Sequence, residues 1–426
     1  MTRLADWLVH EHWLIGAALT RVLLGTWAIY YYVLHFPVRG LLWGPDGLWP
    51  HDRFLTLRSF PNLLQFSPSP LVFEVAYVGA IAVALAYSLG WWPRVMAVLH
   101  WWMIWSFQER NPFITDGGDN LMRIALLFLA AVNTGAYFSL GSGRGRFRWA
   151  PVVRQGLAVA HNFAILLVLA QLSMLYLSTG LYKTMGELWQ QGTALYYVLR
   201  VDEYSWPPIA QAVYQNPYLV VLGTYGTVMF ELMFTPSLFS RWPRYAMIVA
   251  GIAFHVGIGM LMGLVTFAWS MLALYPLLIT DAEYKTTARW LRGRLSLVVL
   301  YDGWCPSCTR SVRWLRALDL FALVDYSSFR EPGALELWGL SSDRAARRIQ
   351  SIGSGGRIAE GADAMIRIFA RSPVLAPLLP VLLACRLVFG QRVYDVLAAG
   401  RLVMVPGGCG PTCPTDGAVA GRQRGA

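Results

Sequence analysis

Residues 297–308 have the sequence LVVLYDGWCPSC, and this stretch decides the fold of the C-terminal part of the chain. Leu297 to Tyr301 form a short apolar run of the kind found in buried strands. Asp302-Gly303 is a turn signal, and Cys305-Pro-Ser-Cys308 opens a segment rich in Arg, Leu and Trp that is typical of a helix. The sequence therefore predicts a strand, a turn and a helix that carries two cysteines at its start.

A Cys-x-x-Cys motif at a helix start is suited to redox chemistry, because unpaired backbone N–H groups and the helix dipole lower the pKa of the first thiol. We expect Cys305 to attack a disulfide and Cys308 to resolve the product. Two alternatives are inert structural thiols and half of a zinc site, with Cys409 and Cys413 as the other half. The atypical spacing of the second pair argues against zinc, so no metal site is expected.

The rest of the C-terminal part continues the alternation of strands and helices. Residues 321–326 predict a second strand, Gly361-Ala-Asp-Ala364 opens another helix, and the apolar run 373–389 is expected to pack against a neighbour. These elements define an α/β domain over residues 297–402, after a basic linker at 286–296. Residues 403–426 are rich in glycine and are predicted to be disordered.

This C-terminal domain resembles the DCC family of thiol-disulfide oxidoreductases. The resemblance is carried by Tyr301 to Cys308, by Gly361-Ala-Asp-Ala364, and by Val393-Tyr394 followed by Arg401, and it covers about residues 296–402. It implies a thioredoxin-like fold and thiol-disulfide exchange with a thiol or disulfide protein partner. Asp302 either accepts a proton from the thiols or caps the turn.

Upstream of this domain, the chain is suited to lipid. Hydrophobic residues make up 56% of the protein and charged residues only 14%, which predicts a mostly α protein with a polytopic transmembrane bundle over residues 1–285. About eight spans are expected. They lie near residues 14–36, 70–90, 94–107, 120–140, 157–181, 217–239, 244–262 and 264–280. Only Gly263 separates the last two, so seven spans are the alternative.

The formal net charge of +11 does not indicate nucleic-acid binding, because the arginines fall between apolar spans. Their excess on the N-terminal side of the bundle predicts a multi-pass protein of the inner (plasma) membrane, with both termini and the C-terminal domain in the cytoplasm. The first apolar run is too long for a cleaved signal peptide, so we expect it to remain as the first span.

Several polar residues fall within these spans, where burial is costly and function is common. Arg21 and Glu231 are expected to form a buried ion pair. For His255 there are two interpretations: it holds a ligand or relays a proton, or it is a satisfied core histidine. Lys183 is one of only two lysines in the chain. It either extends its ammonium group to the membrane surface or acts as a general base, a role that arginine cannot fill.

The bundle resembles the HTTM (horizontally transferred transmembrane) family, which is related to the membrane part of vitamin K-dependent gamma-carboxylases. Four blocks carry the resemblance: Arg21 to Gly25, Arg110-Asn-Pro112 with Gly117-Gly-Asp119, Tyr176 to Lys183 with Trp189 and Gly192, and Phe254-His255 with Phe267. It implies that Lys183 is a catalytic base and that His255, Arg110, Asp119 and Trp189 contribute to a site for a quinone, such as a vitamin K-like hydroquinone. The chain lacks the Asn-His pair and the large lumenal domain of the carboxylases.

These observations favour a membrane-bound redox protein that combines a Cys-x-x-Cys oxidoreductase domain with a bundle binding a quinone-like cofactor. Two alternatives remain. One is a carboxylase-like or peptide-maturation enzyme that uses Lys183 as its base, with His255 and Asp119 in support. The other is a non-catalytic membrane scaffold, in which the C-terminal domain only binds a partner.

Overall fold

The computed structural model describes residues 2–57, 61–140, 150–201, 205–319, 321–372 and 375–400. The chain divides into two compact units, residues 1–284 and 285–426. The boundary falls inside helix α15 (Asp281–Leu295), which also covers most of the predicted basic linker. The predicted disordered tail, residues 403–426, lies outside the described residues.

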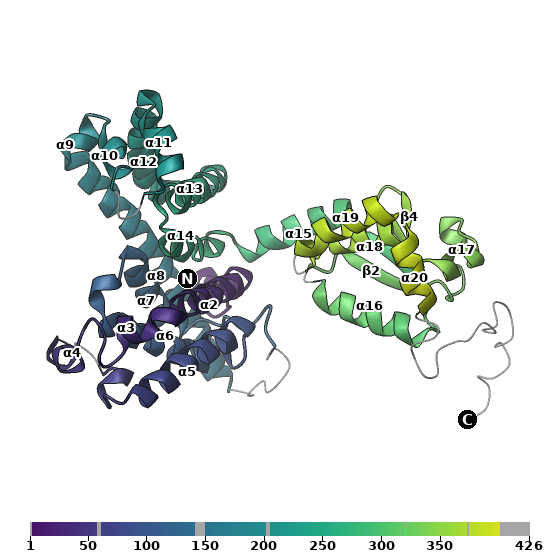
Figure 1. The fold of residues 1–426 in the computed structure, drawn as a ribbon, viewed down its shortest axis with the longest axis horizontal. Helices are drawn as coiled ribbons and strands as arrows, with labels where there is room; N and C mark the ends of the chain where they lie inside the picture. The colour runs from purple at the N-terminus through teal and green to yellow at the C-terminus, as the bar shows by residue number, and fades with distance from the viewer. Residues whose placement is uncertain are drawn as a thin grey trace. The chain divides into compact units, whose positions relative to one another are not determined.

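Unit 1 is a bundle of helices of very different lengths (Figure 1). Before residue 150 it contains α1 (Thr2–Leu8), α2 (Leu14–His35), α3 (Arg39–Trp43), α4 (His51–Leu57), α5 (Pro70–Leu89), α6 (Pro93–Arg110) and α7 (Gly117–Leu129). The later helices are α8 (Pro151–Met185), α9 (Glu187–Gln190), α10 (Ala194–Val198), α11 (Pro207–Tyr214), α12 (Pro217–Ser237), α13 (Arg241–Met262) and α14 (Val265–Leu272).

Five segments are long and apolar enough to cross a membrane, judged by length and composition: Leu14–Trp43, Pro70–Leu89, Pro151–Met185, Pro217–Ser237 and Arg241–Met262. Two strongly bent helix pairs raise the number to seven if each is one span. One pair, Val265–Leu278 with Asp281–Leu295, follows a helix break at Gly263, whose φ of +69° favours glycine. The apolar helices make this a membrane protein, but the expected count of eight spans is not confirmed.

The span predicted at 120–140 is not a single helix. The helix here, α7, has 13 residues, which at 1.5 Å per residue gives about 20 Å, less than the ~30 Å of a hydrocarbon core. Residues 130–140 instead form turns. The apolar composition of this stretch was correctly recognised, but composition alone did not locate the end of the helix.

These turns also explain why the predicted ion pair between Arg21 and Glu231 is wrong. Arg21 is fully buried, and its guanidinium donates hydrogen bonds to the backbone carbonyls of Thr134, at 2.6 Å, and Phe138. Carbonyls that have left the helical pattern need donors, and Arg21 supplies them. Glu231 has a different cation partner, described below.

The bundle core is built around two helix pairs, α2 with α5 and α8 with α12. The first pair approaches closely at Gly25, where a Cβ atom would lie 2.7 Å from Ser88 Cβ. Small residues allow such close approach in membrane bundles. Large buried aromatic side chains, including Trp27, Tyr32 and Tyr77, fill the rest of this core.

Unit 2 contains a four-stranded mixed sheet in the order β2-β1-β3-β4. The strands are β1 (Leu297–Tyr301), β2 (Val324–Ser328), β3 (Gln350–Gly353) and β4 (Ile358–Glu360). Strand β1 is parallel to β2 and antiparallel to β3, and β3 pairs with β4 as a hairpin. The helices are α16 (Pro306–Leu318), α17 (Ser342–Arg347), α18 (Ala362–Phe369), α19 (Leu379–Phe389) and α20 (Arg392–Gly400) (Figure 1).

Strand β1 is buried on both faces, as its uninterrupted apolar sequence predicts. Leu297 and Val299 face a core that includes Ile368 of α18. Val298 and Leu300 face a second core that contains Ala345 of α17. The central position of β1 fixes the loop that follows it, and this loop carries the cysteine motif.

Candidate functional site

The two cysteines of the motif lie at the start of α16, as the sequence predicts. Cys305 is the N-cap residue, and Pro306 is the first residue of the helix. Cys308 follows within the first turn. The side chain of Cys305 is only 5% exposed, whereas Cys308 is half-buried.

Several donors converge on the Cys305 sulfur. The Ser307 hydroxyl lies 3.1 Å from it. Burial by itself raises the pKa of the Cys305 thiol, but hydrogen bonds from the side chains of Ser307 and Cys308 and from their backbone N–H groups outweigh it, so the pKa is lowered. Because thiolates are the reactive form of cysteine, the site favours Cys305 as the nucleophile.

The loop between β1 and α16 is held by residues that follow the neighbouring parallel strand, β2. The Ser328 hydroxyl accepts a hydrogen bond from the Gly303 N–H at 3.2 Å. Arg330 donates from Nε and Nη2 to the two carboxylate oxygens of Asp302, each at 3.2 Å, and its guanidinium lies 4.6 Å from the centre of the Trp304 ring. Asp302 also accepts the Trp304 N–H at 3.1 Å, so it caps the turn.

Sequence reasoning missed Ser328 and Arg330, although a signal was present. The second strand was placed at 321–326, and it runs from Val324 to Ser328. The carboxyl ends of adjacent parallel strands meet at one edge of a sheet. With the strand end placed correctly, both residues could have been assigned to the cysteine loop.

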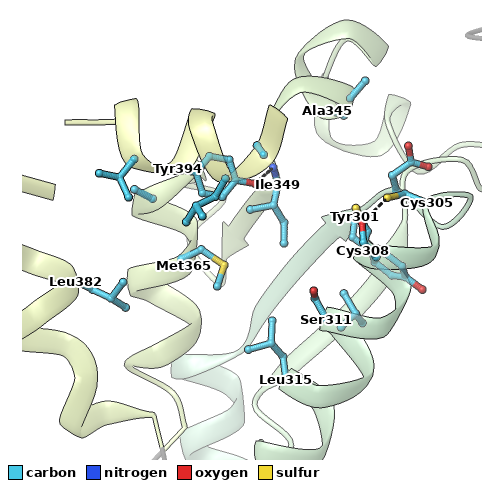
Figure 2. Close-up of a pocket in the computed structure, with 18 of the residues that line it drawn as sticks. Tyr301, Cys305, Cys308, Ser311, Leu315, Ala345, Ile349, Met365, Leu382 and Tyr394 are labelled. Carbon is cyan, nitrogen blue, oxygen red and sulfur yellow. Dashed lines mark hydrogen bonds between the residues drawn. The ribbon is translucent and has the colours of Figure 1, made fainter. Parts of the chain in front are cut away.

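A cavity of about 580 Å³ adjoins the two cysteines. Figure 2 shows Cys305 and Cys308 on one side of it and Met365, Leu382 and Tyr394 on the other. The lining comes from the end of β1, from loops, and from helices α16 to α20. A reactive thiol pair beside a cavity of this size can carry out thiol-disulfide exchange on a bound substrate.

Residues 299–405 match the DCC1-like thiol-disulfide oxidoreductase family. Unit 2 therefore carries a DCC1-like domain. The match includes the end of strand β1 from residue 299, the cysteine motif and all of helices α16 to α20, so the site geometry described above belongs to this domain.

Two proteins of Bacillus subtilis (strain 168) are similar to about half of the chain. The uncharacterized protein YitO is 22% identical over 224 residues, which cover 50% of this chain and 70% of YitO. The sporulation-delaying protein SdpB is 24% identical over 226 residues, which cover 51% of this chain and 68% of SdpB. No solved structure matches the chain. The resemblance of the bundle to the HTTM family stays a prediction.

In the DCC1-like domain, the cavity wall opposite the cysteines is held by two bidentate ion pairs. Arg348 donates from Nε and Nη2 to the carboxylate of Asp395 in α20, each at 2.7 Å. Arg386 of α19 donates to the carboxylate of Asp363 in α18, at 2.8 and 3.0 Å. The hydrogen bonds from Arg348 lower the pKa of the Asp395 carboxyl. These pairs fix α19 and α20 against the rest of the domain.

Among the residues that the structure describes, no group of three or more His, Cys, Asp or Glu side chains could hold a metal ion. Cys409 and Cys413, the proposed second half of a zinc site, lie outside the described residues.

In the bundle, Lys183 lies in an ion pair with Glu231. Its Nζ is 2.8 Å from both carboxylate oxygens, and it lies 5.2 Å from the centre of the Trp189 ring. The structure thus brings two predicted site residues, Lys183 and Trp189, together, and it adds Glu231, which the sequence had assigned to Arg21. The base role of Lys183 stays a prediction.

His255 of α13 lies in a separate polar cluster with Tyr176 of α8. Tyr176 is two helical turns before Lys183, and its hydroxyl lies 2.6 Å from His255 Nε2 and 2.8 Å from the Tyr275 hydroxyl. The histidine is fully enclosed by the bundle. This arrangement satisfies one ring nitrogen of His255, as in the core-histidine alternative, and leaves the Nδ1 atom without a described partner.

Arg110 and Asp119 both have structural contacts. Arg110 is buried and donates to the backbone carbonyls of Trp49 and Gly44, the latter at 2.6 Å. Asp119 forms a capping box with Asp116 at the start of α7 and accepts from Gln108 Nε2 at 3.1 Å. The cavity beside Asp119 measures about 10 Å³, which is room for about one water molecule. It gives no support to quinone binding at this position.

Proposed function

We propose that this protein is a membrane-bound thiol-disulfide oxidoreductase in which Cys305 and Cys308 cycle between a dithiol and a disulfide. The observation that carries the proposal is the position of Cys305: it caps α16, accepts hydrogen bonds that lower its pKa, and lines a large cavity. The strand order β2-β1-β3-β4, with the motif after β1, supports a thioredoxin-like fold for the domain.

The reaction follows from this geometry. The Cys305 thiolate attacks one sulfur of a substrate disulfide, the substrate S–S bond breaks, and the leaving thiolate takes up a proton. Cys308 then attacks the Cys305 sulfur, forms the protein disulfide and releases the second substrate thiol. Two electrons and two protons pass from the protein dithiol to the substrate, and every step is reversible. Cys308 is well placed to resolve the intermediate because it lies in the first turn of the same helix.

The test uses the full chain in detergent with a chromogenic aromatic disulfide as the reporter. We expect Cys305→Ser to lose reductase activity and Cys308→Ser to accumulate a mixed disulfide at Cys305. A matched control is Cys385→Ser, which removes a thiol from the same cavity but outside the motif. Full activity in the Cys305→Ser variant would show that the proposal is wrong.

Localisation in the inner membrane, with both termini in the cytoplasm, is part of this proposal. It is tested by labelling Cys305 and Cys308 with a membrane-impermeant thiol reagent, in a variant that lacks Cys385, Cys409 and Cys413. Labelling in inverted vesicles but not in intact cells is the expected result. Labelling in intact cells would place the domain on the outer face. A lipid bilayer is the environment that this function requires, and a protein thiol or disulfide partner stays a prediction.

A quinone-like ligand in the bundle and a carboxylase-like reaction based on Lys183 stay predictions, as does the scaffold alternative. The Lys183→Arg variant tests the carboxylase-like reaction, because it keeps the positive charge but removes the lysine beside Glu231.

A further inference from the structure

We infer that the cavity beside Cys305 selects an apolar small-molecule disulfide, or the corresponding dithiol, as the redox partner of the cysteine pair. The inference rests on the proposed oxidoreductase function and adds the class of substrate. The cavity volume of about 580 Å³ is within the range of about 300–1,000 Å³ that is usual for small-molecule sites.

The walls of the cavity are mainly apolar. Leu315 of α16 lies on the side of the cysteines, and Met365 of α18 and Leu382 of α19 lie opposite (Figure 2). Burial of a substrate alkyl group against these side chains removes apolar surface from water, which favours binding. The walls therefore favour the binding of a substrate that has hydrocarbon on both sides of its disulfide.

The charged side chains that line the cavity already have partners of opposite charge. Arg330 pairs with Asp302, which also lines the cavity. Arg386 pairs with Asp363. A charged substrate such as oxidised glutathione would lose hydration at the apolar walls without gaining an unpaired side chain of opposite charge among these residues, which is unfavourable. The electrostatics of the cavity thus disfavour charged disulfides.

The lining also argues against an extended polypeptide as the substrate. The described lining residues include none from the edge strands β2 and β4, so the cavity does not present the row of backbone donors and acceptors that strand addition requires. A peptide backbone buried between helices would leave polar groups without partners. Moreover, the Cys305 sulfur belongs to a side chain that is only 5% exposed, so a small molecule reaches it more easily than the surface of a folded protein.

The reaction with such a substrate is balanced without a further cofactor. One substrate S–S bond breaks, one protein S–S bond forms, and the two protons of the protein dithiol end on the two released thiols. The substrate disulfide is reduced by two electrons, which the protein dithiol supplies.

A matched pair of substrates tests the inference. Dipropyl disulfide and bis(2-hydroxyethyl) disulfide have the same number of heavy atoms and differ only in terminal methyl or hydroxyl groups. The full chain in detergent is assayed for kcat/KM with each, and each value is divided by the rate of the same disulfide with a small free dithiol. We expect at least a tenfold preference for dipropyl disulfide, because burial of each of its two terminal methyl groups against the apolar walls favours binding by about fourfold, or about 0.8 kcal/mol.

Two variants on α19 provide the control for detergent partitioning. Leu382 lines the cavity, whereas Leu387 is 85% exposed and is not among the residues that line it. Leu382→Asn is expected to reduce the preference at least fivefold, while Leu387→Asn leaves it unchanged. Circular dichroism establishes that both variants are folded, and the wild-type comparison stands without them.

The possible outcomes are distinct. Equal or faster turnover of bis(2-hydroxyethyl) disulfide overturns the inference but leaves the proposed function intact, since a disulfide is still reduced. A cysteine-containing peptide disulfide preferred over dipropyl disulfide would overturn it in favour of a polypeptide substrate. Failure to reduce the chromogenic reporter as well would overturn the proposed function itself.

Discussion

Replacing Gly303 with alanine is the most direct test of how the fold positions the cysteine pair. A Cβ atom at Gly303 would lie 2.5 Å from Ser328 Oγ and 2.9 Å from Ser328 Cβ, whereas carbon atoms pack best at about 3.5–4.0 Å. The hydroxyl can rotate away, but the Cβ atom is fixed by the pairing of Ser328 with Tyr301 in the sheet. The loop must therefore move away from β2.

The cost has two parts. Overpacking of a well-packed site costs about 1–3 kcal/mol. Loss of the hydrogen bond from the Gly303 N–H to Ser328 Oγ, 3.2 Å long, adds about 0.5–1.5 kcal/mol. The sum is about 1.5–4.5 kcal/mol, which corresponds to roughly a 10-fold to 2,000-fold change in a local opening equilibrium.

The assay is amide hydrogen exchange of the full chain in detergent, followed by mass spectrometry over β1 and the first turns of α16. Gly303→Ala is expected to accelerate exchange in these segments by the factor given above. Gly355→Ala is the control, since a Cβ at that position meets nothing within 4 Å. The double variant Gly303→Ala with Ser328→Gly removes the side chain that the new Cβ atom would meet. At least about 1 kcal/mol of the free energy of local opening that Gly303→Ala loses should therefore be recovered. Exchange within threefold of the wild type, or losses that simply add, would refute the steric argument.

Three further predictions concern ionisable groups. Ser307→Ala removes a hydrogen bond to the Cys305 sulfur, so the pKa of that thiol should rise and the pH profile of its alkylation should move to higher pH. Ser311→Ala, one turn further along α16, is the control and should leave the profile unchanged. Lys183→Met and Glu231→Gln should each destabilise the bundle by roughly 2–4 kcal/mol, somewhat less than the loss of one partner from a fully buried pair, because the Lys183 side chain is 21% exposed. The apparent Tm in detergent measures this loss, and Lys285→Met is the control. Losses that simply add in the double variant would contradict an ion pair between the two residues. Arg348 lowers the pKa of Asp395, and Arg344 together with Arg348 lowers the pKa of Glu360. The stability from these carboxylates is therefore complete above about pH 4.5 and is lost as the pH falls through their folded pKa values. The protection of residues 392–398 from hydrogen exchange, corrected for the intrinsic rate at each pH, should fall below about pH 4, and an unchanged pH dependence in Arg348→Gln would count against this origin.

The local parts of the site could be predicted from the sequence. The run from Leu297 to Cys308 specifies a strand, a turn and a helix through short-range signals, and these signals agree with the tertiary structure. The cap formed by Asp302 was also among the predictions, because a side chain that bonds a backbone N–H two residues later depends only on local geometry.

Long-range partners were harder to predict. The sequence analysis paired Glu231 with Arg21, and hydropathy gave no helix depth or rotation that would have pointed to Lys183 instead. The choice depends on where α7 ends, because the carbonyls of Thr134 and Phe138 exist as free acceptors for Arg21 only once the helix has stopped. Helix ends and helix rotation are tertiary properties, so the ion pair could not be assigned from periodicity alone.

Different parts of the domain determine the position of the thiols and the shape of the substrate cavity. Cys305 and Cys308 follow the central strand β1, which is buried on both faces and held by pairing with two other strands, so their geometry is rigid. The opposite wall, formed by α19 and α20, is held by Arg386–Asp363 and Arg348–Asp395, whose side chains are about 30–40% exposed. Ion pairs as exposed to solvent as these contribute little to stability. Changes in α19 and α20 can therefore alter the shape of the cavity, and hence the substrate, at little cost to the position of the thiols.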